Sequence, residues 1–241
     1  MELRRIHVAF TSYLQKHFNY FVLCFFISST INSYSQTIIK EFKKDSILSI
    51  LAKCKEPQNK VIPSQFDTIV KLALLYFPEL DKTKIIIREK KQASPLTARP
   101  NIFAFFRNAD KRKYIITISN KSSSRFSPIL LSNLSFNSQI GVVGHELSHI
   151  SEYNKKHGLY FIKLLFMQLN KNKIDQLEYN TDLRCIERGL GYQLLSWSTE
   201  VRLKLSLTKW KGIKLLNNKG RERYMNPESI LTEISRLAFY K

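Results

Sequence analysis

The spacing of apolar residues divides the chain into a helical part, a short strand-rich part and a second helical part. Before residue 80, apolar residues recur at helical spacing over 38–54 and 64–78, and the proline-containing segment 55–63 separates these two predicted helices. After residue 83, short runs of β-branched and aromatic residues predict strands, at 84–88, 102–106 and 114–118. Residues 108–111 suit a hairpin turn between the last two strands.

Helical spacing returns after the polar segment 120–128. It predicts helices over 138–154, 159–170 and 173–189, and the last of these ends at Gly189-Leu190-Gly191. Asn226 can cap a further helix that begins at Pro227. The order of helices, sheet and helices predicts an α+β fold, with a small antiparallel or mixed sheet and a mostly helical C-terminal half.

The amino terminus has the layout of a secretory signal peptide. Arg4 and Arg5 precede the apolar run Tyr20–Ile31, and small residues then lead to a cleavage position between Ser35 and Gln36. We therefore expect residues 1–35 to be removed and residues 36–241 to form one exported domain, periplasmic or secreted. The alternative is an uncleaved membrane anchor or a buried helix, although the run is short for a span of about 20 residues.

The chain carries a formal net charge of +20, which favours anionic surroundings. The charges are scattered and mostly lysine, so a solvated basic surface is favoured over a dedicated polyanion site. Contact with an anionic membrane or envelope polymer fits this charge, and no specific nucleic-acid partner is expected. Cys54 and Cys185 can pair in an oxidising compartment, but two cysteines do not make a disulfide framework. Oligomeric state is left open.

Two histidines one helical turn apart are the strongest chemical signal in the chain. His145 and His149 share a face of the predicted helix 138–154, opposite an apolar stripe, and Glu146 follows the first of them. In a shuffled chain of this composition the pattern would arise in about half a percent of cases. The spacing predicts that both histidines bind one metal ion and that Glu146 acts as the general base.

A zinc site with an open position needs a third protein ligand. The three-histidine form of the motif is excluded because Glu152 and Lys155 stand where it needs glycine and histidine, and His157 is expected at the surface. Glu178 and Asp182 share a face of the helix 173–189 with Thr181 and Cys185. Two inward carboxylates are costly unless a cation or strong hydrogen-bond donors compensate.

We therefore expect Glu178 to be the third ligand and Asp182 to orient a ligand histidine through its free ring N–H. The alternative is a surface-exposed carboxylate pair, or an intrahelical network with Arg184 and Glu187. For Cys185, a buried structural thiol is favoured.

The motif His145-Glu146-Leu147-Ser148-His149, followed by Glu178-x-x-x-Asp182, resembles that of the gluzincin zinc metallopeptidases, which include thermolysin and the heat-shock membrane peptidases. The resemblance covers about 84–190, and Thr181 departs from the alanine common there. It implies a zincin-like domain in which zinc (Zn²⁺) activates a water, Glu146 takes its proton, and a peptide bond is hydrolysed.

In this clan a peptide or protein substrate lies along a sheet edge as an added strand. The resemblance implies that 103–106 or 114–119 forms this edge. Members also use a later Tyr, His or Arg to stabilise the oxyanion, and Tyr192, Arg223 and Tyr224 are candidates without an assignment.

Two other readings of the motif remain open. A zinc-binding fold without turnover, or one that hydrolyses a different amide or ester, would use the same ligands. A basic, exported adhesion or wall-binding protein would carry the motif by accident.

Overall fold

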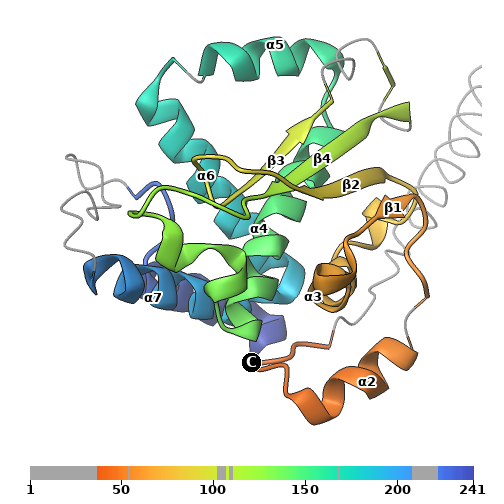
Figure 1. Cartoon of the computed structure of the whole chain (residues 1–241), viewed down its shortest axis with the longest axis vertical. Coiled ribbons are helices and arrows are strands. Elements are labelled where there is room, and N and C mark those ends of the chain that lie inside the picture. The colour runs from red at the N-terminus through yellow and green to blue at the C-terminus, as the bar shows by residue number, and fades with distance from the viewer. Residues whose placement is uncertain (1–36, 54, 102–106, 109–110, 168, 208–221) are drawn as a thin grey trace, which may run out of the picture. The chain divides into compact units, whose positions relative to one another are not determined.

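A small mixed sheet lies on one side of a long central helix (Figure 1). We describe the chain from a computed structural model, which covers residues 37–241 except 54, 102–106, 109–110, 168 and 208–221. Thr37–Lys241 forms one compact unit. The strands run in the order β1-β2-β4-β3; their bounds are β1 Lys60–Val61, β2 Lys84–Glu89, β3 Leu96–Pro100 and β4 Lys113–Ile118.

β1 pairs with β2 and β2 with β4 in parallel, whereas β3 pairs with β4 in the antiparallel sense. The strands predicted at 84–88 and 114–118 are confirmed as β2 and β4, and the expected α+β class with a small mixed sheet is confirmed too. The predicted strand 102–106 and much of the turn 108–111 lie outside the described residues.

β3 is a strand that the apolar pattern did not predict. Its sequence, Leu-Thr-Ala-Arg-Pro, has one large apolar residue and ends in proline, which is tolerated at a sheet edge. Its strand conformation depends on pairing with β4, from Leu96 opposite Ile118 to Pro100 opposite Tyr114. The edge predicted at 114–119 is therefore wrong, because β4 is paired on both sides and β3 forms the described edge.

Helix α4, Phe136–Asn154, is the centre of the unit and packs against α3, α6, α7 and β3. Its predicted apolar stripe is buried, as are both histidines on the other side; the stripe comprises Ile140, Val143, Leu147 and Ile150. Gly141 lets α7 approach closely, since a Cβ at this position would lie 2.2 Å from the carbonyl oxygen of Gln193.

The chain then continues through a series of helices, with bounds α5 Gly158–Met167, α6 Lys171–Cys185, α7 Gly191–Leu207 and α8 Pro227–Arg236. α6 ends in a π-helical turn, Ile186–Leu190, in which Gly189 has a φ of 94°. This confirms the predicted helix end, because a positive φ favours glycine. The Asn226 side chain accepts a hydrogen bond from the Ser229 N–H and caps α8 as predicted. α7 was not predicted as a separate helix.

The amino-terminal helices are shorter than predicted. α2 spans Lys44–Ala52, and a 3₁₀ turn, Ser64–Phe66, precedes α3, Asp67–Leu74. The short 3₁₀ turns that remain are Pro78–Leu80, Ser127–Ile129, Leu131–Asn133 and Ala238–Tyr240. In the described part of the chain, no helix is both long enough and apolar enough to cross a membrane. The predicted signal peptide lies outside the described residues.

Candidate metal centre

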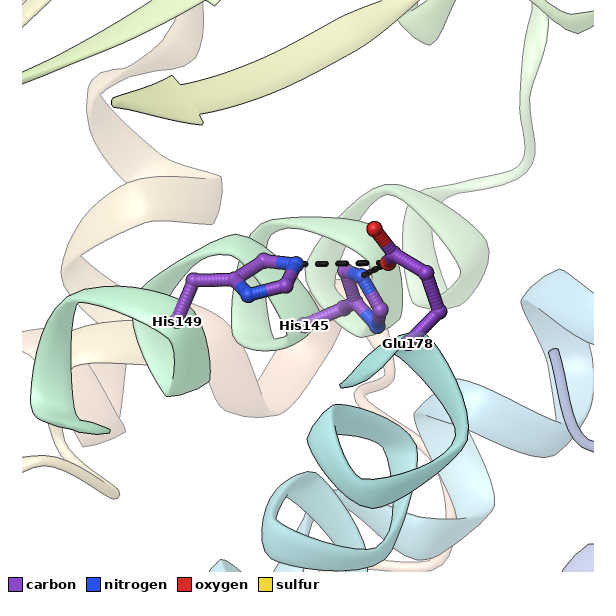
Figure 2. Close-up of side chains that lie close together, drawn as sticks. All are labelled: His145, His149 and Glu178. Carbon is purple, nitrogen blue, oxygen red and sulfur yellow. Dashed lines mark hydrogen bonds and ion pairs between the residues drawn. The ribbon is translucent and has the colours of Figure 1, made fainter. Parts of the chain in front are cut away.

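Three potential metal ligands from two helices meet beside the sheet (Figure 2). His145 and His149 come from α4 and Glu178 from α6, and their ligand atoms all lie within 4.8 Å of one another. Glu178 Oε2 is 3.1 Å from Nε2 of His145 and 3.3 Å from Nε2 of His149. The three residues predicted as ligands are thus brought together.

The partners of the other ring nitrogens fix both histidine tautomers. Nδ1 of His145 lies 2.7 Å from Oδ1 of Asp182, a carboxylate oxygen that only accepts, so Nδ1 carries the proton. Nδ1 of His149 lies 3.3 Å from Oγ1 of Thr181, whose own hydrogen goes to the Leu177 carbonyl at 2.8 Å. His149 therefore also donates from Nδ1, so Nε2 of each ring is the nitrogen left to bind a proton or a metal ion.

Two nitrogen lone pairs and a carboxylate oxygen facing one another repel unless positive charge lies among them. The donor set of two imidazoles and one carboxylate is one that zinc accepts in catalytic sites. Ligand atoms at tetrahedral positions around zinc are separated by about 3.3 Å, which agrees with the two distances to Glu178. The residues present therefore fit a zinc ion with an open fourth position.

The surrounding charges favour a cation as well. Burial disfavours charge on His145, but Asp182 and Glu178 outweigh it and raise the pKa of this histidine well above its usual value. Burial also opposes ionisation of Glu178, yet the two histidines hold its pKa well below the usual range. The carboxylates of Asp182 and Glu178 therefore favour positive charge beside His145, whether a proton or a metal ion carries it.

Asp182 is held as the sequence predicted. It is fully buried, and its second oxygen, Oδ2, accepts a hydrogen bond of 2.8 Å from the backbone N–H of Met225. Both carboxylate oxygens therefore have donors, and these fix the angle at which Asp182 faces His145. The alternative of an exposed pair is contradicted by the burial of Asp182 and the low exposure of Glu178, and the alternative of a network with Arg184 because Arg184 pairs with Glu152 of α4 at 3.3 Å.

Glu146 lies between the histidines and the sheet edge. Burial raises the pKa of its carboxyl group, and the backbone N–H of Ala98 on β3 donates a hydrogen bond to it. Ala98 pairs with Ile116, between the hydrogen-bonded positions marked by Asn101 N–H to Lys113 O and Ser119 N–H to Pro95 O. The N–H and C=O of Ala98 therefore point to the free edge of β3, toward the site.

A cavity of about 500 Å³ opens beside this centre, and His145 and Glu146 form part of its wall. Most of the remaining wall is apolar, with Leu96, Leu131, Val142, Trp197 and Val201 among its residues. Arg202, Arg223 and Tyr224 add polar groups. The centre thus borders a space large enough for a bulky apolar side chain.

Two of the three candidates for the oxyanion role lie at the centre. Tyr224 lines the cavity with its ring 5.7 Å from that of His145, and burial and the nearby carboxylates raise its pKa well above the usual value. Arg223 lines the cavity and pairs with Asp175. Tyr192 packs instead against Tyr240, with ring centroids 5.5 Å apart.

Sequence reasoning missed several residues of the centre. Trp197 lies with its ring 5.9 Å from His145, and the backbone N–H groups of Ala98 and Met225 hold the two buried carboxylates. Backbone groups leave no signal in a sequence. Trp197 lies in α7, and the apolar spacing of that helix could have predicted it.

The remaining predictions for individual residues concern His157 and the two cysteines. His157 is exposed, as expected. Cys185 is buried and free, which agrees with a structural thiol, while Cys54 lies outside the described residues. No protein-family model, curated protein or solved structure matches this chain.

Proposed function

We propose that this protein is a zinc-dependent metallopeptidase that resembles the gluzincins. The observation that carries the proposal is that the Nε2 atoms of both histidines meet the Glu178 carboxylate beside the buried carboxyl group of Glu146. This arrangement supports a metal ion with a proton acceptor next to it, which is what hydrolysis by an activated water needs.

Zinc, when bound by His145, His149 and Glu178, would supply a Lewis acid that polarises the scissile carbonyl and acidifies a water molecule. Glu146 takes the proton of that water on its carboxylate and returns it to the leaving nitrogen. The Ala98 N–H orients the Glu146 carboxylate for this transfer. Asp182 keeps the proton of His145 on Nδ1, so that Nε2 remains a ligand.

The substrate class follows from the surroundings of Glu146. The edge of β3 that no described strand pairs with still offers the Ala98 carbonyl to an extended chain, although its N–H is used by Glu146, and this favours a peptide or protein substrate. The apolar cavity on the same side would accept a large apolar side chain of that peptide.

We also propose export, with cleavage between Ser35 and Gln36, which mass spectrometry of the mature amino terminus tests.

Metal analysis of the purified full chain tests the site itself. We expect about one zinc per chain in the wild type and its loss in His149→Ala, because a two-ligand site holds zinc weakly. His157→Ala is the matched control, since this exposed histidine lies outside the centre. Absence of stoichiometric zinc in the wild type would overturn the proposal and favour the accidental motif.

A further inference from the structure

Helix α5 presents large apolar side chains to solvent. Their exposed fractions run from 44% to 85%, across Leu159, Ile162, Leu165, Phe166 and, just past the helix, Leu169. Exposed apolar residues normally occur singly on a soluble surface. A contiguous group of this size therefore indicates a surface that contacts something apolar.

The exposed residues form one stripe of the helix. At 100° per residue, Leu159, Ile162, Leu165 and Phe166 fall within about 120° of one another. On the opposite side, Tyr160 and Leu164 pack against the core. Phe161, which lies next to Leu165 around the helix, is buried and packs against Tyr153 at 5.8 Å between ring centroids. These three residues hold α5 on the core, and the exposed stripe takes no part in that packing.

The charge around this stripe has a single sign. Residues 153–174 contain lysines but no aspartate or glutamate, and the lysines are Lys155, Lys156, Lys163, Lys171 and Lys173. All are exposed except Lys156, which is half-buried and pairs with Glu152 at 2.8 Å. An apolar stripe bordered by lysines is the pattern of a helix that lies in the interface of an anionic bilayer.

We propose that α5 docks on an anionic lipid membrane, with the stripe Leu159–Phe166 among the acyl chains and the lysines at the headgroups. Long lysine side chains can keep their ammonium groups at the headgroup level while their stems cover apolar surface. Each lysine near such a surface strengthens binding by roughly fivefold. A second copy of the chain is a poorer occupant, because a symmetric contact through α5 would bring two lysine fringes together.

Docking would hold the metal centre near the lipid surface. α5 joins α4, which carries the two histidines, to α6, which carries Glu178 (Figure 1). Glu178 follows the start of α6 by about 10 Å along the helix axis. The proposal does not need the peptidase activity, and its test reads lipid contact alone.

The experiment places a tryptophan on α5 and a matched one elsewhere in the full chain. Leu159→Trp and Leu48→Trp replace two leucines of equal exposure, 78% each, and Leu48 lies on α2 rather than beside the stripe. Vesicles contain phosphatidylcholine alone or with phosphatidylglycerol, and brominated lipids quench tryptophan at the acyl chains. The wild type gives the background of its own tryptophans.

We expect a blue shift and strong quenching of Trp fluorescence for Leu159→Trp on anionic vesicles, and little of either for Leu48→Trp.

Replacing Lys155, Lys163, Lys171 and Lys173 with Gln should raise the lipid concentration for half-maximal quenching at least about a hundredfold. The same number of exposed lysines around α2, namely Lys43, Lys44, Lys53 and Lys55, gives a control with equal net charge. That control should change the half-maximal concentration little.

Three outcomes would overturn the proposal. Quenching at position 159 no stronger than at position 48 would show that α5 stays out of the bilayer. A blue shift without vesicles that grows with protein concentration would assign the stripe to a second copy. A blue shift without vesicles that is independent of concentration would assign it to a segment of the same chain, such as Tyr20–Ile31.

Discussion

The metal centre and helix α5 are neighbours in sequence and opposites in construction. In α4 and α6 ionisable side chains face inward, whereas in α5 large apolar side chains face outward. Both arrangements run against the usual partition of a folded chain, in which ionisable groups face water and apolar groups are buried. Each therefore points to a binding partner from outside the chain, a cation in one case and an apolar phase in the other.

The two regions differ in how tightly neighbouring groups of the protein hold their side chains in place. In the centre, Asp182 has donors on both carboxylate oxygens, and Thr181 fixes the His149 tautomer. Such pre-arrangement means that removing one group disturbs several others. The α5 stripe stands on a helix whose inner face is already packed, so its residues should be replaceable without loss of fold.

The largest expected effect is that of Glu146→Gln on peptide hydrolysis. Glutamine cannot accept the proton of the water, so the rate constant should fall by roughly a thousandfold while zinc content stays unchanged. Fluorogenic peptides with large apolar or charged side chains measure the rate, and the apolar ones should be preferred. Unchanged hydrolysis would remove Glu146 from the mechanism.

Glu152→Gln is the control for this substitution. Glu152 lies on the same helix but pairs with Lys156 and Arg184, at 2.8 and 3.3 Å. Hydrolysis by this variant should be little changed. If the wild type binds zinc but cleaves none of the peptides, the protein is a zinc-binding fold without this activity.

Zinc should also stabilise the fold, because it binds only the folded state. At a free zinc concentration 100 times the dissociation constant, the free energy of unfolding rises by about 2.7 kcal/mol. Calorimetry should therefore show a lower Tm for the wild type when a chelator has removed the zinc. The Tm of His149→Ala should not respond to the chelator; an equal response would place the stabilising zinc elsewhere.

Asp182→Asn should weaken zinc binding about 10- to 100-fold. Asparagine has one acceptor oxygen, so either the His145 N–H or the Met225 N–H loses its partner. Competition with a fluorescent zinc chelator measures the affinity. Asp175→Asn is the control, since this buried aspartate of α6 pairs with Arg223; equal losses would deny Asp182 its orienting role.

The smallest expected effect is that of substitutions in the α5 stripe on the free energy of unfolding of the protein. Leu159→Ser and Phe166→Ser should change the free energy of unfolding by no more than about 0.5 kcal/mol in the absence of lipid, as exposed positions do. Urea unfolding measures this. For comparison, Leu147→Ala in the core of α4 should cost about 2–5 kcal/mol. A loss of that size at Phe166 would make the stripe part of the core.

Much of the fold could be predicted because its helices carry local signals. α4, α6 and the start of α8 follow from apolar spacing and from Gly189 and Asn226 at their ends. β2 and β4 are rich in isoleucine, and most of these isoleucines are buried. β3 was missed because its strand conformation depends on pairing with β4 rather than on its own residues. α7 was missed because the segment after Gly191 was not divided into a helix and the part that follows it.

The sequence by itself determined which residues are candidates for binding a metal. Helical geometry sets His145 and His149 one turn apart, and the composition leaves few other histidines. Only the tertiary structure decided that Glu178 meets both Nε2 atoms, that Asp182 and Thr181 fix the tautomers, and that Ala98 faces Glu146. Those contacts join residues far apart in the chain, through backbone groups and helix packing that no local pattern encodes.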